Sequence, residues 1–215
     1  MKKNSLYSIV DISKVIVFDF DGIVLESAGI KDEAYFELFS DLPIDKRISA
    51  LKYHVLTPGV NRRKKIKKMM QLFLNYPVTG RSVDFYCNRY AELVACKLEN
   101  CSVVDGFLDF CEVFKAKPIY VASAAPESEV IEISKKKDLF LLFKKIYGSP
   151  DNKVNILNKI IYEESIEPKD LVFIGDRESD FAVSATTSVH FLGRNVYGSL
   201  DGVCCMKFES FFDLK

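Results

Sequence analysis

The chain has 215 residues, an apolar fraction of 48%, and 30 basic residues against 30 acidic ones. This length is enough for one large domain or for a domain with an insertion, and the apolar residues are sufficient for a full core. The balanced charge gives no overall field that would favour nucleic acid or an anionic membrane as a partner.

The N-terminal segment shows no targeting signal. Residues 1–5 are followed by no long apolar stretch, because Asp11 and Lys14 interrupt the apolar character. We therefore expect neither a signal peptide nor a membrane span. The six cysteines form no C-x-x-C pair and only two histidines accompany them, so we expect no zinc site. Reduced thiols are typical of a cytoplasmic protein, which is the location that we expect.

The first predicted element is a strand that begins at Val15 and leads into Asp19-Phe-Asp21-Gly22. Its β-branched and aromatic residues are typical of a strand buried on both faces of a parallel sheet. Asp19 and Asp21 stand two residues apart, so they leave the strand on the same side. Ligands of open α/β sheets bind at the carboxyl ends of strands, where buried acids must be paired, solvated or bound to metal. A solvated acidic turn would explain this segment equally well.

A helical block follows this strand. The spacing of apolar residues predicts helices over 30–39, 45–56, 61–74 and 82–99, with no convincing strand between Leu25 and Lys117. The basic run that begins at Arg62 could indicate nucleic-acid binding. The apolar residues interspersed with it favour an amphipathic helix with a solvated face instead. His54 is interpreted as a satisfied surface or core histidine.

From residue 105 onward, strands and helices alternate. We predict helices over 105–115, 127–137, 152–164 and 178–185, and strands over 118–122, 145–147, 171–174 and, as the last one, 189–192. This alternation is typical of a parallel sheet covered by helices on both faces, and it predicts an α/β fold with a Rossmann-like core. The predicted core domain comprises residues 1–27 and 103–215, and the inserted helical cap domain comprises residues 28–102.

Three later strands also end in polar residues. Ser123 is followed by Ala124 and a helix start, which suits close approach to an anion but is also how a plain helix N-cap looks. Lys153 stands in the first turn of a helix, where a cation needs an anionic partner, although lysines are also common on surfaces. Asp176 and Asp180 follow Gly175 at the end of a buried strand. Together these residues provide oxygen ligands for Mg²⁺ and a cradle for an anion.

In this order and spacing, the four motifs resemble those of the haloacid dehalogenase (HAD) superfamily of phosphohydrolases. Asp19-Phe-Asp21-Gly22 resembles the first motif, Ser123 the second, Lys153 the third, and the segment from Gly175 to Asp180 the fourth. The resemblance covers essentially the whole chain, and the helical insert is similar to the four-helix C1 cap of that superfamily.

The resemblance implies a role for each of these residues. Asp19 is the nucleophile that forms an aspartyl-phosphate, and Asp21 is the general acid and base, a role that needs a raised pKa. Ser123, Ala124 and Lys153 bind the phosphoryl oxygens. The metal is Mg²⁺, bound by the Asp19 carboxylate, the Asp21 main-chain carbonyl and Asp176. Asp180 is expected to orient Lys153 or a metal-bound water.

The acid at Asp21 favours phosphoryl transfer, because dehalogenating members of the superfamily lack an acid at that place. The implied function is a phosphatase acting on a small phosphorylated metabolite, such as a sugar phosphate or phosphoglycolate-like compound. A phosphosugar mutase of the β-phosphoglucomutase type is the alternative, and a non-catalytic phosphate-binding module is a third possibility. The loop from Thr57 to Arg62, with its Gly59, is similar to the substrate loop of C1 caps, so Arg62 is a candidate substrate contact. We expect a monomer or a weak dimer.

Overall fold

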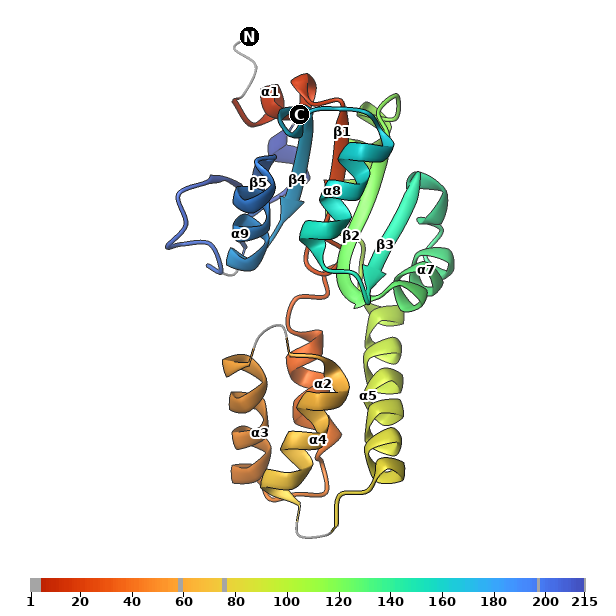
Figure 1. The fold of residues 1–215 in the computed structure, drawn as a ribbon, viewed down its shortest axis with the longest axis vertical. Helices are drawn as coiled ribbons and strands as arrows, with labels where there is room; N and C mark the ends of the chain where they lie inside the picture. The colour runs from red at the N-terminus through yellow and green to blue at the C-terminus, as the bar shows by residue number, and fades with distance from the viewer. Residues whose placement is uncertain (1–4, 58–59, 75–76, 197, 215) are drawn as a thin grey trace. The chain divides into compact units, whose positions relative to one another are not determined.

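The computed structural model describes residues 5–57, 60–74, 77–196 and 198–214. The chain divides into two compact units, one formed by residues 1–26 with 102–215 and the other by residues 27–101. The first is an α/β unit and the second is helical (Figure 1). No helix in the described part of the chain is long and apolar enough to cross a membrane.

The α/β unit is built on a parallel six-stranded sheet with the order β3-β2-β1-β4-β5-β6. Its strands are β1 (Val15–Phe18), β2 (Ile119–Pro126), β3 (Lys145–Ser149), β4 (Leu171–Gly175), β5 (His190–Arg194) and β6 (Met206–Phe208). This Rossmann-like arrangement confirms the predicted fold class. The chain moves from β1 outward to β2 and β3, then returns to the other side of β1 with β4, so the order reverses beside β1. Ligands of open α/β sheets bind at such a reversal.

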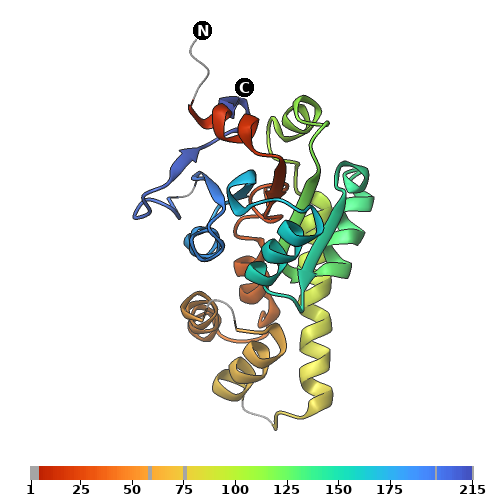
Figure 2. The ribbon, with the colours of Figure 1, turned by 45° about the horizontal axis from the view of Figure 1, so that its top comes forward.

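Helices cover both faces of this sheet, in agreement with β1, in which every residue is apolar and buried. Val15 and Val17 point to the face covered by α8 (Lys153–Glu163) and α9 (Glu178–Thr187), which lie next to each other in Figure 2. Phe18 points to the opposite face, where its ring packs against Phe107 at 5.1 Å between centroids. The remaining helical elements of the unit are α1 (Ser5–Ile12), α6 (Phe107–Val113), α7 (Glu127–Lys136), and the short 3₁₀ turns Phe140–Leu142, Pro168–Asp170 and Phe211–Leu214.

The helical unit consists of α2 (Ile30–Leu38), α3 (Ile44–Leu56), α4 (Arg62–Phe73) and α5 (Gly80–Asn100). Two helix starts are fixed by side chains: Asn61 accepts a hydrogen bond from the Arg63 amide, and Thr79 forms a capping box with Ser82. The unit has its own apolar core, to which all four helices contribute, with members that include Ala34, Leu38, Ala50, Ile66, Met69, Met70 and Val94.

The structure contains two elements that the sequence interpretation missed. The strand expected to be last, at 189–192, is followed by β6, which pairs with β5 at the edge of the sheet. The segment Met206–Phe208 alternates apolar and polar residues, but at three residues it is too short for this pattern to predict a strand, so its pairing with β5 defines it. A helix at Ser5–Ile12 was also not expected. Within the described residues between 26 and 117 there is no strand, as predicted.

Candidate active site

Three buried aspartates gather at the carboxyl end of the sheet. Oxygen atoms from Asp19, Asp176 and Asp180 all lie within 4.8 Å of one another, and each residue is buried. Asp19 directly follows β1, Asp176 directly follows β4, and Asp180 lies in the first turn of α9. Among the described residues, these three aspartates are the group of side chains that could together bind a metal ion.

The register of the sheet explains why these acids meet. Phe18 pairs with Ile174 across β1 and β4, and the amide of Asp19 donates to the Ile174 carbonyl at 2.8 Å. β1 ends at Phe18 and β4 ends at Gly175, so Asp19 and Asp176 leave neighbouring strand ends at the same edge of the sheet. Gly175 makes room for the third acid, because a Cβ at this position would lie 2.6 Å from the Cβ of Asp180.

Lys153 places a cation in the cluster. As the first residue of α8, it places its Nζ 2.9 Å from Asp19 Oδ1 and 2.6 Å from Asp180 Oδ1. Burial opposes the charge on this lysine, but the carboxylates of Asp180 and Asp19 together raise its pKa. Arg177, the neighbour of Asp176 in the chain, also interacts electrostatically with these acids. Two cations therefore face the four carboxylates of Asp19, Asp21, Asp176 and Asp180, and the cluster remains short of positive charge.

This shortage shows in the acids themselves. Burial raises the pKa of Asp19 to about 6, against the effect of Lys153. Burial, together with the charges of Asp19 and Asp180, raises the pKa of Asp176 to about 7. Asp176 Oδ1 and Asp180 Oδ2 are buried and have no hydrogen-bond partner among the described residues. Buried carboxylate oxygens without partners, in a site with excess negative charge, are suitable ligands for a hard divalent cation.

Asp21 lies in the tight loop that follows Asp19. It forms an isolated bridge with Leu25, and the amide of Gly22 donates to the Leu25 carbonyl at 2.9 Å. The carboxylate of Asp21 is not one of the three grouped acids, but its charge contributes to the raised pKa of Asp19. Gly22 has φ +80, and a Cβ on it would meet Asp176 Oδ2 at 2.4 Å. The loop therefore packs directly on the acidic cluster.

Ser123 is fully buried near the end of β2, the neighbour of β1. Its Oγ accepts a hydrogen bond from the Ala125 amide at 3.1 Å. The N-cap residue of α7 is Pro126, so Ser123 is not a plain helix cap. Ala124 is exposed at the same strand end.

Arg62 belongs to the helical unit, where it is the first residue of α4 and its guanidinium lies 5.0 Å from the centre of the Tyr90 ring. Pro58 and Gly59, which complete the candidate substrate loop, lie outside the described residues. The structure thus groups the acids and Lys153, and it leaves the role of Arg62 a proposal.

His54, also in the helical unit, has a partner for each ring nitrogen. Nδ1 lies 3.0 Å from Lys65 Nζ and Nε2 lies 3.0 Å from Asp32. Its ring stacks on Tyr35 with a centroid distance of 4.1 Å. These contacts are those of a satisfied structural histidine.

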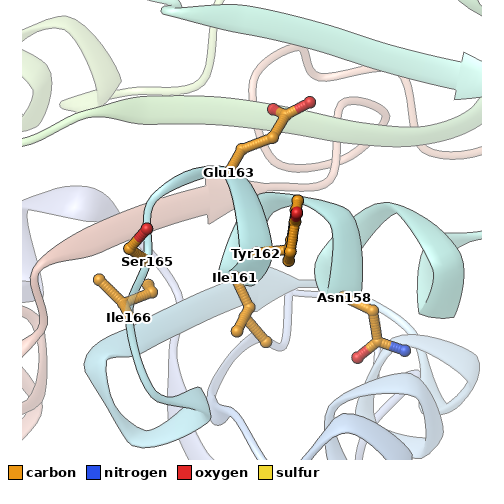
Figure 3. Close-up of a pocket in the computed structure, with 6 residues that line it drawn as sticks. All are labelled: Asn158, Ile161, Tyr162, Glu163, Ser165 and Ile166. Carbon is orange, nitrogen blue, oxygen red and sulfur yellow. The ribbon is translucent and has the colours of Figure 1, made fainter.

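A hollow of about 590 Å³ lies elsewhere, at the C-terminal end of α8 (Figure 3). Lys153 is the first residue of that helix, so the hollow and the acidic cluster lie at opposite ends of it. The residues that line the hollow are Asn158, Ile161, Tyr162, Glu163, Ser165 and Ile166. The hollow is therefore not part of the acidic site.

One buried residue near the site was not identified from the sequence. Arg194, at the end of β5, contacts the loop of Asp21. The predicted strand ended two residues earlier, at residue 192, so the arginine was not placed at a strand end. The signal available in the sequence was that Arg194 is a charged residue two positions after the end of an apolar run.

Comparison with known proteins places these observations in a family. Residues 13–183 match the family described as haloacid dehalogenase-like hydrolase. The chain belongs to this family. The match includes all four strand ends that carry the acids, the serine and the lysine. None of the curated proteins compared with the chain matches it.

Several solved structures share the fold of this HAD-like hydrolase. One, described as a predicted phosphoglycolate phosphatase from Haemophilus somnus, is 16% identical, with a TM-score of 0.75, over 94% of this chain and 96% of that one. The HAD-hydrolase YfnB from Bacillus subtilis, bound to magnesium, is 15% identical, with a TM-score of 0.73, over 94% and 96%. A mutant of CbbY from Rhodobacter sphaeroides, in complex with xylulose-(1,5)bisphosphate, is 12% identical, with a TM-score of 0.70, over 93% and 95%. At these identities the likeness concerns the fold.

Proposed function

We propose that this HAD-like hydrolase is a Mg²⁺-dependent phosphatase that cleaves a small phosphomonoester through an aspartyl-phosphate on Asp19. The observation that carries the proposal is the buried cluster of Asp19, Asp176 and Asp180 around a single lysine. A site with excess buried negative charge suits a divalent cation, and a cation with a lysine suits a phosphoryl group.

Asp19, Asp176 and the main-chain carbonyl of Asp21 would hold the metal. The unpartnered Asp176 Oδ1 supports this assignment. When bound, Mg²⁺ supplies positive charge that lets an anionic carboxylate approach an anionic phosphate. Asp180 would hold Lys153 in place through Oδ1, 2.6 Å from Nζ, and its unpartnered Oδ2 would orient a metal-bound water.

The chain's own residues carry the chemistry in two steps. The Asp19 carboxylate attacks phosphorus, the bond to the leaving oxygen breaks, and Asp21 gives its proton to that oxygen. Asp21 then takes a proton from water, which attacks the aspartyl-phosphate and releases phosphate and free Asp19. Lys153, the Ser123 hydroxyl and the backbone at Ala124 bind the phosphoryl oxygens in both steps.

The substrate class follows from two supporting observations. The acidic cluster contains one lysine that can pair with a phosphoryl group. Similar folds occur in a protein described as a predicted phosphoglycolate phosphatase and in one crystallised with a sugar bisphosphate. We therefore propose a sugar phosphate or a phosphoglycolate-like compound, with Arg62 of the helical unit as a contact to its polar groups.

The test is release of inorganic phosphate from 4-nitrophenyl phosphate, with Mg²⁺ and with a chelator in its place. Turnover that requires Mg²⁺ supports the phosphatase, and absence of turnover on this compound and on a panel of sugar phosphates, phosphoglycolate and nucleotides contradicts it. Within the panel, Arg62→Gln should raise KM for the preferred substrate and leave 4-nitrophenyl phosphate unaffected. Conversion of a sugar phosphate into its isomer faster than phosphate release would favour a mutase.

A further inference from the structure

Arg194 makes an unusually complete set of contacts for a buried residue. Only 6% of it is exposed. Its Nη1 donates to the Gly22 carbonyl at 2.8 Å, and Nη1 and Nη2 bind the two carboxylate oxygens of Glu26 at 3.1 and 2.5 Å. Its Nε donates to the Glu209 carbonyl at 3.0 Å. A forked pair of this kind fixes direction as well as distance.

Both of its targets on the N-terminal side belong to one loop. Gly22 and Glu26 lie near the two ends of the segment 20–26, which leaves β1 after Asp19. Inside the segment, the amide of Val24 donates to the Phe20 carbonyl at 2.9 Å, so the chain turns back on itself. Arg194 reaches this turn from β5, which is separated from β1 by β4. It therefore ties the turn to a distant part of the sheet.

The position of this turn matters for the acids. Asp21 directly precedes Gly22, and Gly22 packs against Asp176 so closely that a Cβ would not fit. A shift of the Gly22 carbonyl would move the Gly22–Ile23 peptide unit, and through Gly22 it would change the position of Asp21 relative to Asp19. Burying a guanidinium is costly unless it is paired, and the Gly22 carbonyl, the Glu26 carboxylate and the Glu209 carbonyl supply partners for Arg194.

We propose that Arg194 is a positioning residue that clamps the loop 20–26 and so holds Asp21 where it can transfer a proton. The hydrogen bonds of Arg194 go to Gly22, Glu26 and Glu209, to none of which we assign a step of the reaction. The role in proton transfer rests on the proposed phosphatase function, whereas the clamp itself does not.

The first test separates proton transfer from general damage by the choice of leaving group. An alkyl phosphate needs a proton on its leaving oxygen, whereas 4-nitrophenyl phosphate releases a stable anion. The value of kcat/KM reports the steps up to the first phosphoryl transfer. For Arg194→Met we expect a loss of about 10- to 100-fold on the alkyl phosphate and of less than about threefold on the aryl phosphate. Arg194→Lys, which keeps the charge but loses the fork, should recover part of the loss.

The matched control is Ile160→Val, a change in a fully buried residue of α8 that lowers stability without touching the loop. It should lose little activity, and equally on both substrates, at a temperature where every variant is folded. Equal losses on the two phosphates in Arg194→Met, or a loss that Ile160→Val reproduces, would overturn the role in proton transfer.

The second test examines the clamp without turnover. Hydrogen exchange of the loop amides that are bonded within the turn, such as Gly22 and Val24, should be at least about tenfold faster in Arg194→Met and unchanged in Ile160→Val. Exchange at the wild-type rate in Arg194→Met overturns the inference, whatever the kinetics show. A wild-type protein that cleaves neither phosphate counts against the phosphatase and the proton-transfer role together, and the exchange rates still decide the clamp.

Discussion

Each of the two units contains a lysine whose side chain is largely withdrawn from solvent, and the surroundings of the two lysines differ. In the α/β unit, Lys153 lies 2.9 Å from Asp19 and 2.6 Å from Asp180, with Asp176 in the same cluster. In the helical unit, Lys65 lies 3.0 Å from the Nδ1 atom of His54. The Nε2 atom of the same ring lies 3.0 Å from Asp32 Oδ1.

The difference lies in what remains unpaired. Around Lys153, three buried carboxylates share this lysine and the charge of nearby Arg177, and two of their oxygens have no hydrogen-bond partner among the described residues. Around Lys65, burial lowers the lysine pKa, and the only carboxylate that counters this effect belongs to Asp32, whose side chain is 48% exposed. Polar burial that is satisfied within the chain is structural. Excess buried charge requires a ligand, and only the α/β cluster has that property.

The largest effect is expected at the proposed nucleophile. Asp19→Asn keeps the shape of the side chain but removes its nucleophilic oxygen, so phosphate release should fall about 10⁴-fold or more. The same change removes one of the crowded negative charges, so the metal-free protein should melt at a higher temperature. Asp151→Asn, the same substitution at an exposed position, is the control and should change neither quantity. More than a tenth of wild-type turnover in Asp19→Asn would contradict the assignment.

The two lysines themselves provide the next prediction. Lys153→Met leaves Asp19 and Asp180 without their cation in a buried site, so the free energy of unfolding should fall by about 3–5 kcal/mol. Lys65→Met removes a buried amine whose nearest side-chain partner is the His54 ring, and should cost about 1 kcal/mol or less. Urea unfolding of the two variants measures the difference. Equal losses would mean that both clusters are structural.

The sequence predicted much of this contrast because strand ends are visible in sequence. Asp19 and Asp176 each follow an apolar run, and a parallel sheet places such run ends at one edge. The contacts of Arg194 were not predictable in the same way. They depend on where a loop folds back, and periodicity carries no information on that. The pairing of His54 with Lys65 likewise depends on how α3 and α4 pack, which side-chain spacing along one helix does not define.

The acidic cluster of the α/β unit should also make the stability of the protein depend on pH. The folded pKa values of Asp19 and Asp176 are about 6 and about 7, above the ordinary value of 3.8. Between these limits the folded protein binds more protons than the unfolded one, so the stability of the metal-free protein falls as pH rises. From pH 5 to pH 8 the loss should be on the order of 2–4 kcal/mol.

Mg²⁺ should restore this stability at pH 8 and do little at pH 5, where the acids hold protons. Thermal unfolding with and without Mg²⁺ at both pH values measures the effect. In Asp176→Asn the dependence on both pH and Mg²⁺ should shrink. A Mg²⁺ effect of the same size at both pH values would argue against these acids as the ligands.

The smallest effect concerns two glycines with left-handed backbones, one in each unit. Gly22 has φ +80 and Gly29 has φ +87, so alanine at either position should cost about 1–2 kcal/mol of conformational energy. A Cβ at Gly29 would have nothing within 4 Å, whereas a Cβ at Gly22 would lie 2.4 Å from Asp176 Oδ2.

Gly29→Ala therefore measures the backbone cost alone. Gly22→Ala adds displacement of an acid in the cluster, and should lose about 1–2 kcal/mol more in stability and about tenfold in turnover. The apparent affinity for Mg²⁺ should weaken in Gly22→Ala and remain unchanged in Gly29→Ala, because only the former moves a proposed ligand. If both variants lose the same stability and both bind Mg²⁺ normally, then the close packing of the loop on Asp176 has no part in assembling the site.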